Sequence, residues 1–112
     1  MLFRSDVHRF DQLTLELLLS VVGESDRLAF TRQVFNEIPA GGRNEALRSL
    51  RAYFDADGSL SRAAAVLHIH KNTLTGRLNR IAETTGLDPR RIGDAAILWL
   101  ALQLTPHLQQ GV

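Results

Sequence analysis

The sequence predicts an all-α protein, a helical bundle, from its apolar spacing, its breaks and its composition. Leu74, Leu78 and Ile81 recur at i, i+4 and i+7, the spacing of one inward face of a helix. Breaks rich in glycine or proline divide the chain, the clearest being Pro-Ala-Gly-Gly at 39–42. With 45% hydrophobic and 22% charged residues, 112 residues suit a single domain with a real core.

The first 40 residues predict a helical hairpin or linker. The run 11–22 is apolar around most of a helical circumference, and Gly23 is expected to end it. Ser25 is the candidate N-cap of a second helix. That helix is expected over 26–38, with four apolar residues available for burial: Leu28, Val34, Phe35 and Ile38.

The remaining segment, 43–108, is predicted to form the functional domain. Asn44 is the candidate cap of its first helix, whose inward stripe is Leu47, Leu50 and Phe54, flanked by the core residue Tyr53. Gly58 then suits a left-handed turn.

Two short helices follow, and they indicate a helix-turn-helix. Ser59 or Ser61 is expected to cap the first, which carries small and apolar residues: Ala63, Ala64, Val66 and Leu67. A break at 68–70 precedes the second helix, opened by His70 or Asn72 and running over about 71–85. Such a pair is the form of a DNA-binding motif whose second helix enters the major groove. His68 stands where many such turns have a glycine in left-handed backbone conformation. A histidine can adopt that conformation at some cost in free energy.

After Gly86, which is expected to end the second helix, a short turn and one more helix complete the domain. Asp88 and Pro89 predict the turn. Asp94 is the candidate cap of a final helix ending before Pro106, and the segment 95–104 is apolar nearly all round. That helix should be buried against the domain or against a second copy of the chain, with Trp99 in the core.

Charge is distributed unevenly along the chain. Residues 1–40 carry a net charge of −2, whereas residues 61–91 carry +4, although the whole chain carries only +1. A clustered positive charge is what a phosphate-facing surface needs, and duplex DNA is the expected partner. A solvated helix face is the alternative interpretation.

Several classes of protein are disfavoured. The absence of cysteine excludes disulfide scaffolds and thiolate chemistry, and apolar runs of about ten residues are too short to cross a bilayer. We expect a cytoplasmic protein without a signal peptide. No nucleophile elbow, acid–base pair or phosphate loop is present, so neither an enzyme nor a cofactor is expected. His68 and His70 lack a third ligand nearby, so no metal site is predicted.

The stretch 50–88 resembles the C-terminal helix-turn-helix domain of the PucR family, which includes sugar-diacid regulators of the CdaR type. The resemblance lies in LRAYFDADGSL, RAAAVL, HIHKNTL, RLNRI and TGLD, in the expected order. RAAAVLHIHKNTL also resembles the recognition unit of the Fis nucleoid protein, which implies a Fis-like helix-turn-helix. Family members are bacterial transcription regulators with a sensory region ahead of this domain. The chain would therefore be either a piece of a longer regulator or a short member.

Three positions depart from the family pattern. The family usually has arginine where this chain has Lys71, and commonly a basic residue and an aromatic where it has Thr75 and Gly76. A glycine inside a helix costs about 1 kcal/mol relative to alanine. Either Gly76 permits close approach to DNA, or the protein reads its site with fewer side chains.

The predicted DNA-binding residues lie in both helices. The start of the second helix should meet base edges, with Lys71 on a phosphate or base and Asn72 and Thr75 forming hydrogen bonds. Residues further along it should meet the DNA backbone, and the start of the first helix should hold a phosphate. Capping or solvated roles are the alternatives. The full set is Ser59, Ser61, Arg62, His70, Lys71, Asn72, Thr73, Thr75, Arg77 and Arg80.

The sequence thus predicts a sequence-specific, DNA-binding transcriptional regulator acting as a homodimer. The leucine-rich helix over 11–22 or the helix over 95–104 would form the interface. The alternative is a helical protein-interaction module that does not read DNA, for which the clustered positive charge would have no purpose.

Overall fold

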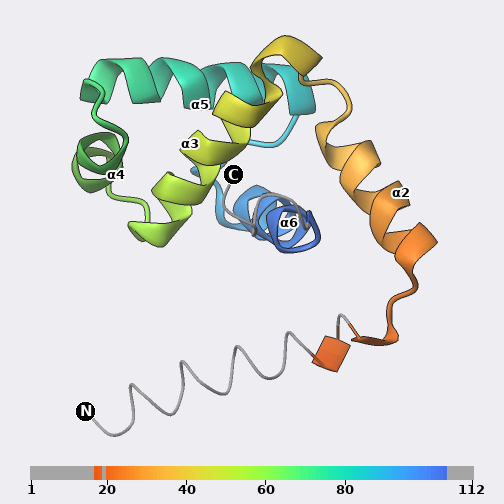
Figure 1. The fold of residues 1–112 in the computed structure, drawn as a ribbon. Helices are drawn as coiled ribbons and strands as arrows, with labels where there is room; N and C mark the ends of the chain where they lie inside the picture. The colour runs from red at the N-terminus through yellow and green to blue at the C-terminus, as the bar shows by residue number, and fades with distance from the viewer. Residues whose placement is uncertain (1–16, 19, 106–112) are drawn as a thin grey trace, which may run out of the picture.

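The computed structural model describes residues 17–18 and 20–105, and all regular elements in this part of the chain are helices (Figure 1). The all-α prediction is confirmed. Most of the helix expected over 11–22 lies outside the described residues. The elements are α2 (Glu24–Phe35), the 3₁₀ turn η1 (Ala40–Gly42), α3 (Arg43–Asp55), α4 (Leu60–Leu67), α5 (Lys71–Thr85) and α6 (Ile92–Gln103).

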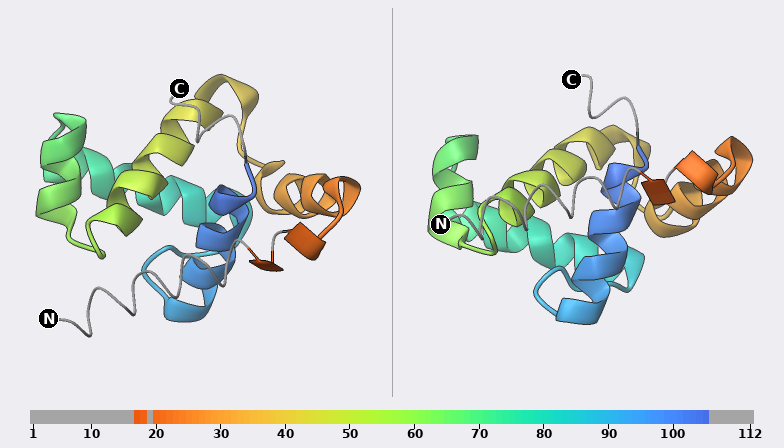
Figure 2. Two further views of the ribbon diagram at one scale, coloured as in Figure 1. Left: turned by 60° about the horizontal axis from the view of Figure 1, so that its bottom comes forward. Right: turned by 90° about the horizontal axis from the view of Figure 1, so that it is seen from below.

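Helix α3 is the centre of the packing. It contacts α4, α5 and α6, while α2 packs against α6, away from the end of α5 where α4 lies (Figures 1 and 2). Leucines from α3, α5 and α6 form the core, and the most deeply buried are Leu50, Leu74, Leu78, Leu98 and Leu102. The predicted inward stripe of α5 is therefore confirmed, and Tyr53 is also buried. Phe54 packs against the core while half-buried.

Several predicted helix ends are confirmed. The Ser59 hydroxyl oxygen accepts a hydrogen bond from the backbone N–H of Arg62 at 3.2 Å, so Ser59 rather than Ser61 caps α4. Gly86 has φ +78° and is the C-cap of α5, while Gly58, at φ +82°, forms the predicted left-handed turn between α3, whose C-cap is Ala56, and α4. These turns separate α3, α4 and the loop after α5.

Three predicted caps are wrong. Gly23, Gly42 and Arg91 occupy the cap positions instead of Ser25, Asn44 and Asp94. Helix α3 starts two residues earlier than predicted because η1 runs directly into it. Asp94 lies in the first turn of α6, where Oδ2 accepts a hydrogen bond from the backbone N–H of Asp88 at 3.0 Å. The carboxylate ties the preceding loop to the positive end of α6.

The loop between α5 and α6 forms the predicted turn. The backbone N–H of Arg91 donates to the carbonyl of Asp88 at 3.0 Å. Oδ1 of Asp88 accepts hydrogen bonds from the backbone N–H and from the side-chain Nε of Arg90, and these bonds lower the pKa of this carboxyl from its usual range. The carboxylate thus joins Asp88 to Arg90 within the turn.

The final helix is only partly buried against the domain, and Trp99 is not in the core, contrary to its prediction; burial of the remaining face against a second copy of the chain stays a prediction. Helix α6 buries Leu98, Ala101 and Leu102, but Ile92 is 88% exposed and Trp99 is 40% exposed. A helix packed on one side of a small domain has partners for only part of its circumference, whatever its composition. No helix in the described range is long and apolar enough to traverse a lipid bilayer.

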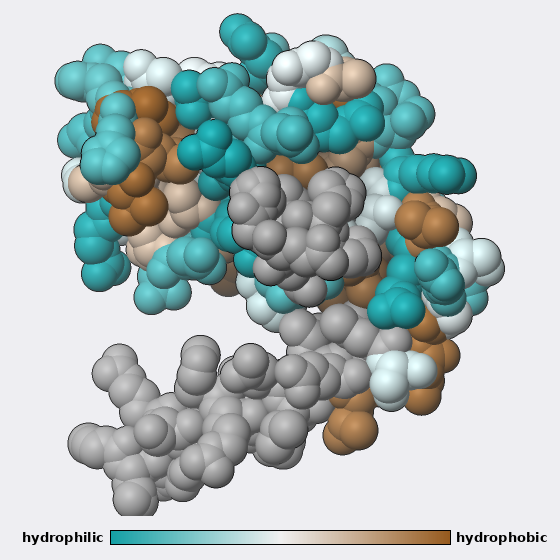
Figure 3. Space-filling view, viewed as in Figure 1, coloured by the Kyte–Doolittle hydropathy of each residue, from teal (hydrophilic) through white to brown (hydrophobic). Residues whose placement is uncertain are grey.

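Other apolar residues also remain at the surface. Leu28 of α2 and Val66 of α4 are exposed. The sequence predicted Leu28 to be available for burial and Val66 to be one of the apolar positions of its helix. Figure 3 shows hydrophobic residues on the outer side of α2, whereas the upper edge of the molecule, where α5 lies, is mainly hydrophilic. In this view the hydrophilic surface follows α5, and a separate hydrophobic patch lies over α4.

Candidate nucleic-acid interface

Small residues allow α4 to sit close to its neighbours. Ala63 and Ala64 are buried, and α4 contacts both α3 and α5. The turn after it consists of three residues, 68–70, as the sequence predicts. His68 adopts φ +58° and ψ +42°, and the backbone N–H of Ile69 donates to the carbonyl of Ala64 at 3.0 Å. A left-handed histidine thus closes α4 and redirects the chain into α5.

Helix α5 has one buried face and one polar face. Leu74, Leu78 and Ile81 are buried, which fixes the rotation of the helix about its axis. The polar residues on the other side are exposed, apart from Thr75, which is half-buried. We call this surface the recognition face, and it consists of Lys71, Asn72, Thr73, Thr75, Gly76, Asn79 and Arg80.

His70 has a structural role in this arrangement. Its Nδ1 atom accepts a hydrogen bond from the backbone N–H of Asn72 at 2.9 Å, which caps α5. The sequence left His70 and Asn72 as alternative openers of this helix, and the structure assigns the cap to His70. The side chain of Asn72 is thereby left for another partner.

Replacing His70 with alanine is expected to lower the free energy of unfolding by about 1 kcal/mol, because the backbone N–H of Asn72 loses its acceptor. Urea denaturation would measure the change. His70→Asn is the matched control, since asparagine is a strong N-cap and should retain most of the stability. Equal losses in both variants would contradict a capping role.

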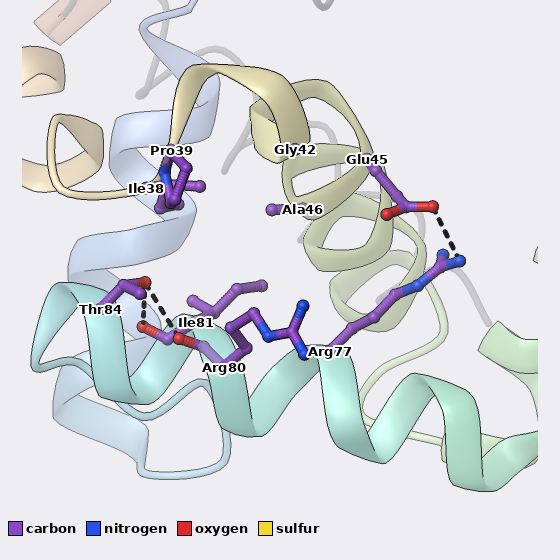
Figure 4. Close-up of a pocket in the computed structure, with 9 residues that line it drawn as sticks. All are labelled: Ile38, Pro39, Gly42, Glu45, Ala46, Arg77, Arg80, Ile81 and Thr84. Carbon is purple, nitrogen blue, oxygen red and sulfur yellow. Dashed lines mark hydrogen bonds and ion pairs between the residues drawn. The ribbon is translucent and has the colours of Figure 1, made fainter.

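Arg77 binds α3 and does not point to solvent. One guanidinium nitrogen lies 2.9 Å from a carboxylate oxygen of Glu45, and the other donates to the hydroxyl of Ser49 at 3.3 Å. Figure 4 shows the side chain reaching across from α5 to α3. Ser49 is buried, and only 28% of the Arg77 side chain is exposed. Arg77 therefore fastens α5 to α3.

Lys71 and Arg80 are the cations of α5 that remain available. Both are exposed, and neither forms an ion pair with another residue of the described segments. Arg80 extends along α5 beside a hollow between that helix and the start of α3 (Figure 4). Glu83 is exposed one turn further on, and its negative charge would repel a phosphate. The positive part of α5 therefore ends near Arg80.

The start of α4 holds the other predicted residues. Ser61 and Arg62 are exposed, while Ser59 is half-buried and its hydroxyl is occupied in the cap. The guanidinium of Arg62 donates to the carbonyl of Ala56 at 3.4 Å, a contact that an anion would replace at little cost. Free N–H groups and the helix dipole make this helix end suited to a phosphate.

Asn79 is a residue that the predicted set missed. It is exposed and lies seven residues, about two helical turns, after Asn72. The helical periodicity that places Leu74, Leu78 and Ile81 on the buried face also places Asn79 on the opposite, exposed face. Conversely, no sequence pattern shows that Arg77 is held by Glu45 and Ser49, because these residues lie 28 or more positions away in the chain.

The family model of the PucR C-terminal helix-turn-helix domain matches residues 46–104, which contain α4, the turn and α5. The chain belongs to this family. The resemblance seen in the sequence is confirmed, and the PucR-type domain includes α6 as well as the two motif helices.

Related proteins include regulators much longer than this chain. The carbohydrate diacid regulator of Escherichia coli is 46% identical over 57 residues, 51% of this chain and 15% of its own length. The transcriptional activator PmfR of Paenarthrobacter nicotinovorans is 41% identical over 58 residues, covering 52% and 12%. Protein YsfB of Bacillus subtilis is 32% identical over 92 residues, covering 82% and 24%.

The chain thus spans less than a quarter of the length of each of these relatives. No solved structure matches it significantly. Two of these three relatives are named for their function, one as a regulator and one as a transcriptional activator, which agrees with a helix-turn-helix domain from a transcription regulator.

Proposed function

We propose that this PucR-type domain binds duplex DNA sequence-specifically, with α5 in the major groove, and regulates transcription as a homodimer. The recognition face carries the proposal, because it combines exposed hydrogen-bonding side chains with Lys71 and Arg80 and is opposite the buried leucines. Base edges would be read by the amides and hydroxyls, and phosphates would be neutralised by the cations.

The start of α4 would supply a second contact to the DNA backbone. Ser61, Arg62 and the N–H groups of this helix end would hold a phosphate while the first turns of α5 lie in the groove. Ser59 would act by capping α4. His70 and Arg77 would act indirectly, by fixing the start and the position of α5.

The proposed dimer would place two recognition helices in half-sites about 34 Å apart. Its interface would use the apolar surface that the domain leaves uncovered, on α6 or on the segment before α2. Exposed residues there include Leu17, Leu18, Val21, Ile92 and Trp99. A monomeric protein seldom exposes so many large apolar side chains on neighbouring elements.

A protein-interaction module is the second candidate function, and the same exposed apolar side chains favour it. Fluorescence anisotropy with a pool of random duplex DNA, across a salt series, separates the two. Retention of an inverted repeat supports the dimeric DNA reader. Binding without enrichment contradicts sequence-specific reading, and no binding at low salt contradicts a DNA-binding function.

Lys71→Ala and Arg77→Ala are expected to differ in the salt dependence of DNA binding. Removing Lys71 should reduce the slope of log K against log salt by about 1, because one phosphate contact is lost. Removing Arg77 should leave the slope unchanged and lower stability in urea denaturation, because its partners are Glu45 and Ser49. A slope change in Arg77→Ala alone would reverse the two assignments.

A further inference from the structure

Gly76 is the feature of α5 that the fold does not explain. It lies in the interior of a 15-residue helix, where glycine is unfavourable because it gains the most backbone freedom on unfolding. A methyl group at Gly76 would meet no atom of the described residues within 4 Å, and the position is exposed. Within this part of the chain, packing therefore does not require a glycine here.

The neighbours of Gly76 on the outer surface are asparagines. Asn72 precedes it by four residues and Asn79 follows it by three, so all three lie along one stripe of α5. Both asparagines are exposed. The hydrogen bond to His70 uses the backbone N–H of Asn72 and leaves its side-chain amide unused. An asparagine amide can form two hydrogen bonds with the N6 and N7 atoms of adenine in the major groove.

Arginine, the usual reader of guanine, is absent from the centre of this stripe. Arg77 is directed to Glu45 and Ser49, and Arg80 lies at the flank, beside the hollow next to α3. The stripe is thus composed of two amides with a gap between them. In an A·T pair the thymine 5-methyl group projects into the major groove and would occupy such a gap.

We infer that the stripe Asn72–Gly76–Asn79 selects A·T pairs, an inference that rests on the proposed DNA-binding function. The backbone of α5 at Gly76 would then lie against a thymine methyl group. Seven residues of helix span about 10.5 Å, which is at most about three base-pair steps of 3.4 Å because a helix in the major groove is inclined to the duplex axis. Each half-site should therefore contain two A·T pairs two to three steps apart, with a thymine between the two amide contacts.

The first test is the composition of the duplexes that the wild-type protein retains from a random pool. Enrichment of A·T pairs at this spacing supports the inference. Enrichment of G·C pairs at both positions, in duplexes that bind tightly, would overturn it while leaving the DNA-binding function intact. Failure of the wild-type protein to bind any duplex would instead overturn the proposed function.

Gly76→Ala supplies the second test. The methyl group should raise Tm by about 4–8 °C, because alanine is the better helix former. It should nevertheless weaken binding to the retained duplex about tenfold, the loss of roughly one base contact. Replacing thymidine with deoxyuridine in that half-site should recover most of the lost affinity, because the 5-methyl group is removed.

Gly93→Ala in α6 is the matched control. Gly93 is also exposed and helical, and a methyl group there would meet no atom of the described residues within 4 Å. DNA affinity should be unchanged in this variant. Equal or tighter binding by Gly76→Ala, or a deficit that deoxyuridine does not relieve, would show that the backbone at Gly76 does not meet a thymine methyl group.

Discussion

Replacing Asn72 with alanine is expected to weaken binding to the selected duplex by about 10- to 100-fold, the worth of one two-bond contact to a base. The side chain is exposed on α5, and its amide is not used in the cap formed by His70. Alanine favours helix, so the fold should be preserved. Titrations of a labelled duplex at several salt concentrations would measure the loss.

The salt dependence distinguishes this effect from a backbone contact. Asn72→Ala should leave the slope of log K against log salt unchanged, because an amide carries no charge to neutralise a phosphate. Asn36→Ala is the matched control, since Asn36 is exposed at the end of α2. A similar loss in both variants would mean that Asn72 does not read a base.

Leu78→Ala is expected to lower the free energy of unfolding by about 2–5 kcal/mol, through lost apolar burial and the cavity left behind. Leu78 is fully buried in α5, where it packs in the core with Leu50 of α3. A small domain has about 5–15 kcal/mol of stability in total, so this loss is a large fraction of it and the variant should unfold at a clearly lower urea concentration than the wild type. Urea titration followed by far-ultraviolet circular dichroism would measure the change.

The matched control is Leu28→Ala, the same substitution at a residue that α2 leaves exposed. Its cost should be below about 0.5 kcal/mol, as for most surface substitutions. Trp99, the single tryptophan of the chain, provides an independent fluorescence probe because it lies partly exposed on α6. Similar destabilisation by the two leucine variants would contradict the described core.

Local patterns determined the elements of this fold. Leu74, Leu78 and Ile81 identified the buried face of α5, since helical periodicity places them on one side in any environment. Gly58 identified the left-handed turn before α4, and Gly86 identified the end of α5, because glycine adopts left-handed backbone without strain. The family also followed from the motif residues alone.

Prediction of caps was less successful because several residues near a helix start can serve as the cap. Ser59 is the observed cap of α4, whereas Asp94 binds the preceding loop instead of capping α6. Asn44 does not cap α3, because η1 runs directly into that helix and Gly42 occupies the cap position. The choice among neighbouring candidates depends on the direction from which the chain enters the helix, which propensity does not contain.

The sequence by itself determined the helices, the motif and the buried face of α5, because these depend on residues within a few turns of one another. Only the tertiary structure decided that Arg77 binds Glu45 and Ser49 and that Trp99 stays partly exposed on α6. Both outcomes depend on which helices meet across the core. Such contacts join residues distant in the chain, and a charged or apolar residue alone does not reveal its partner.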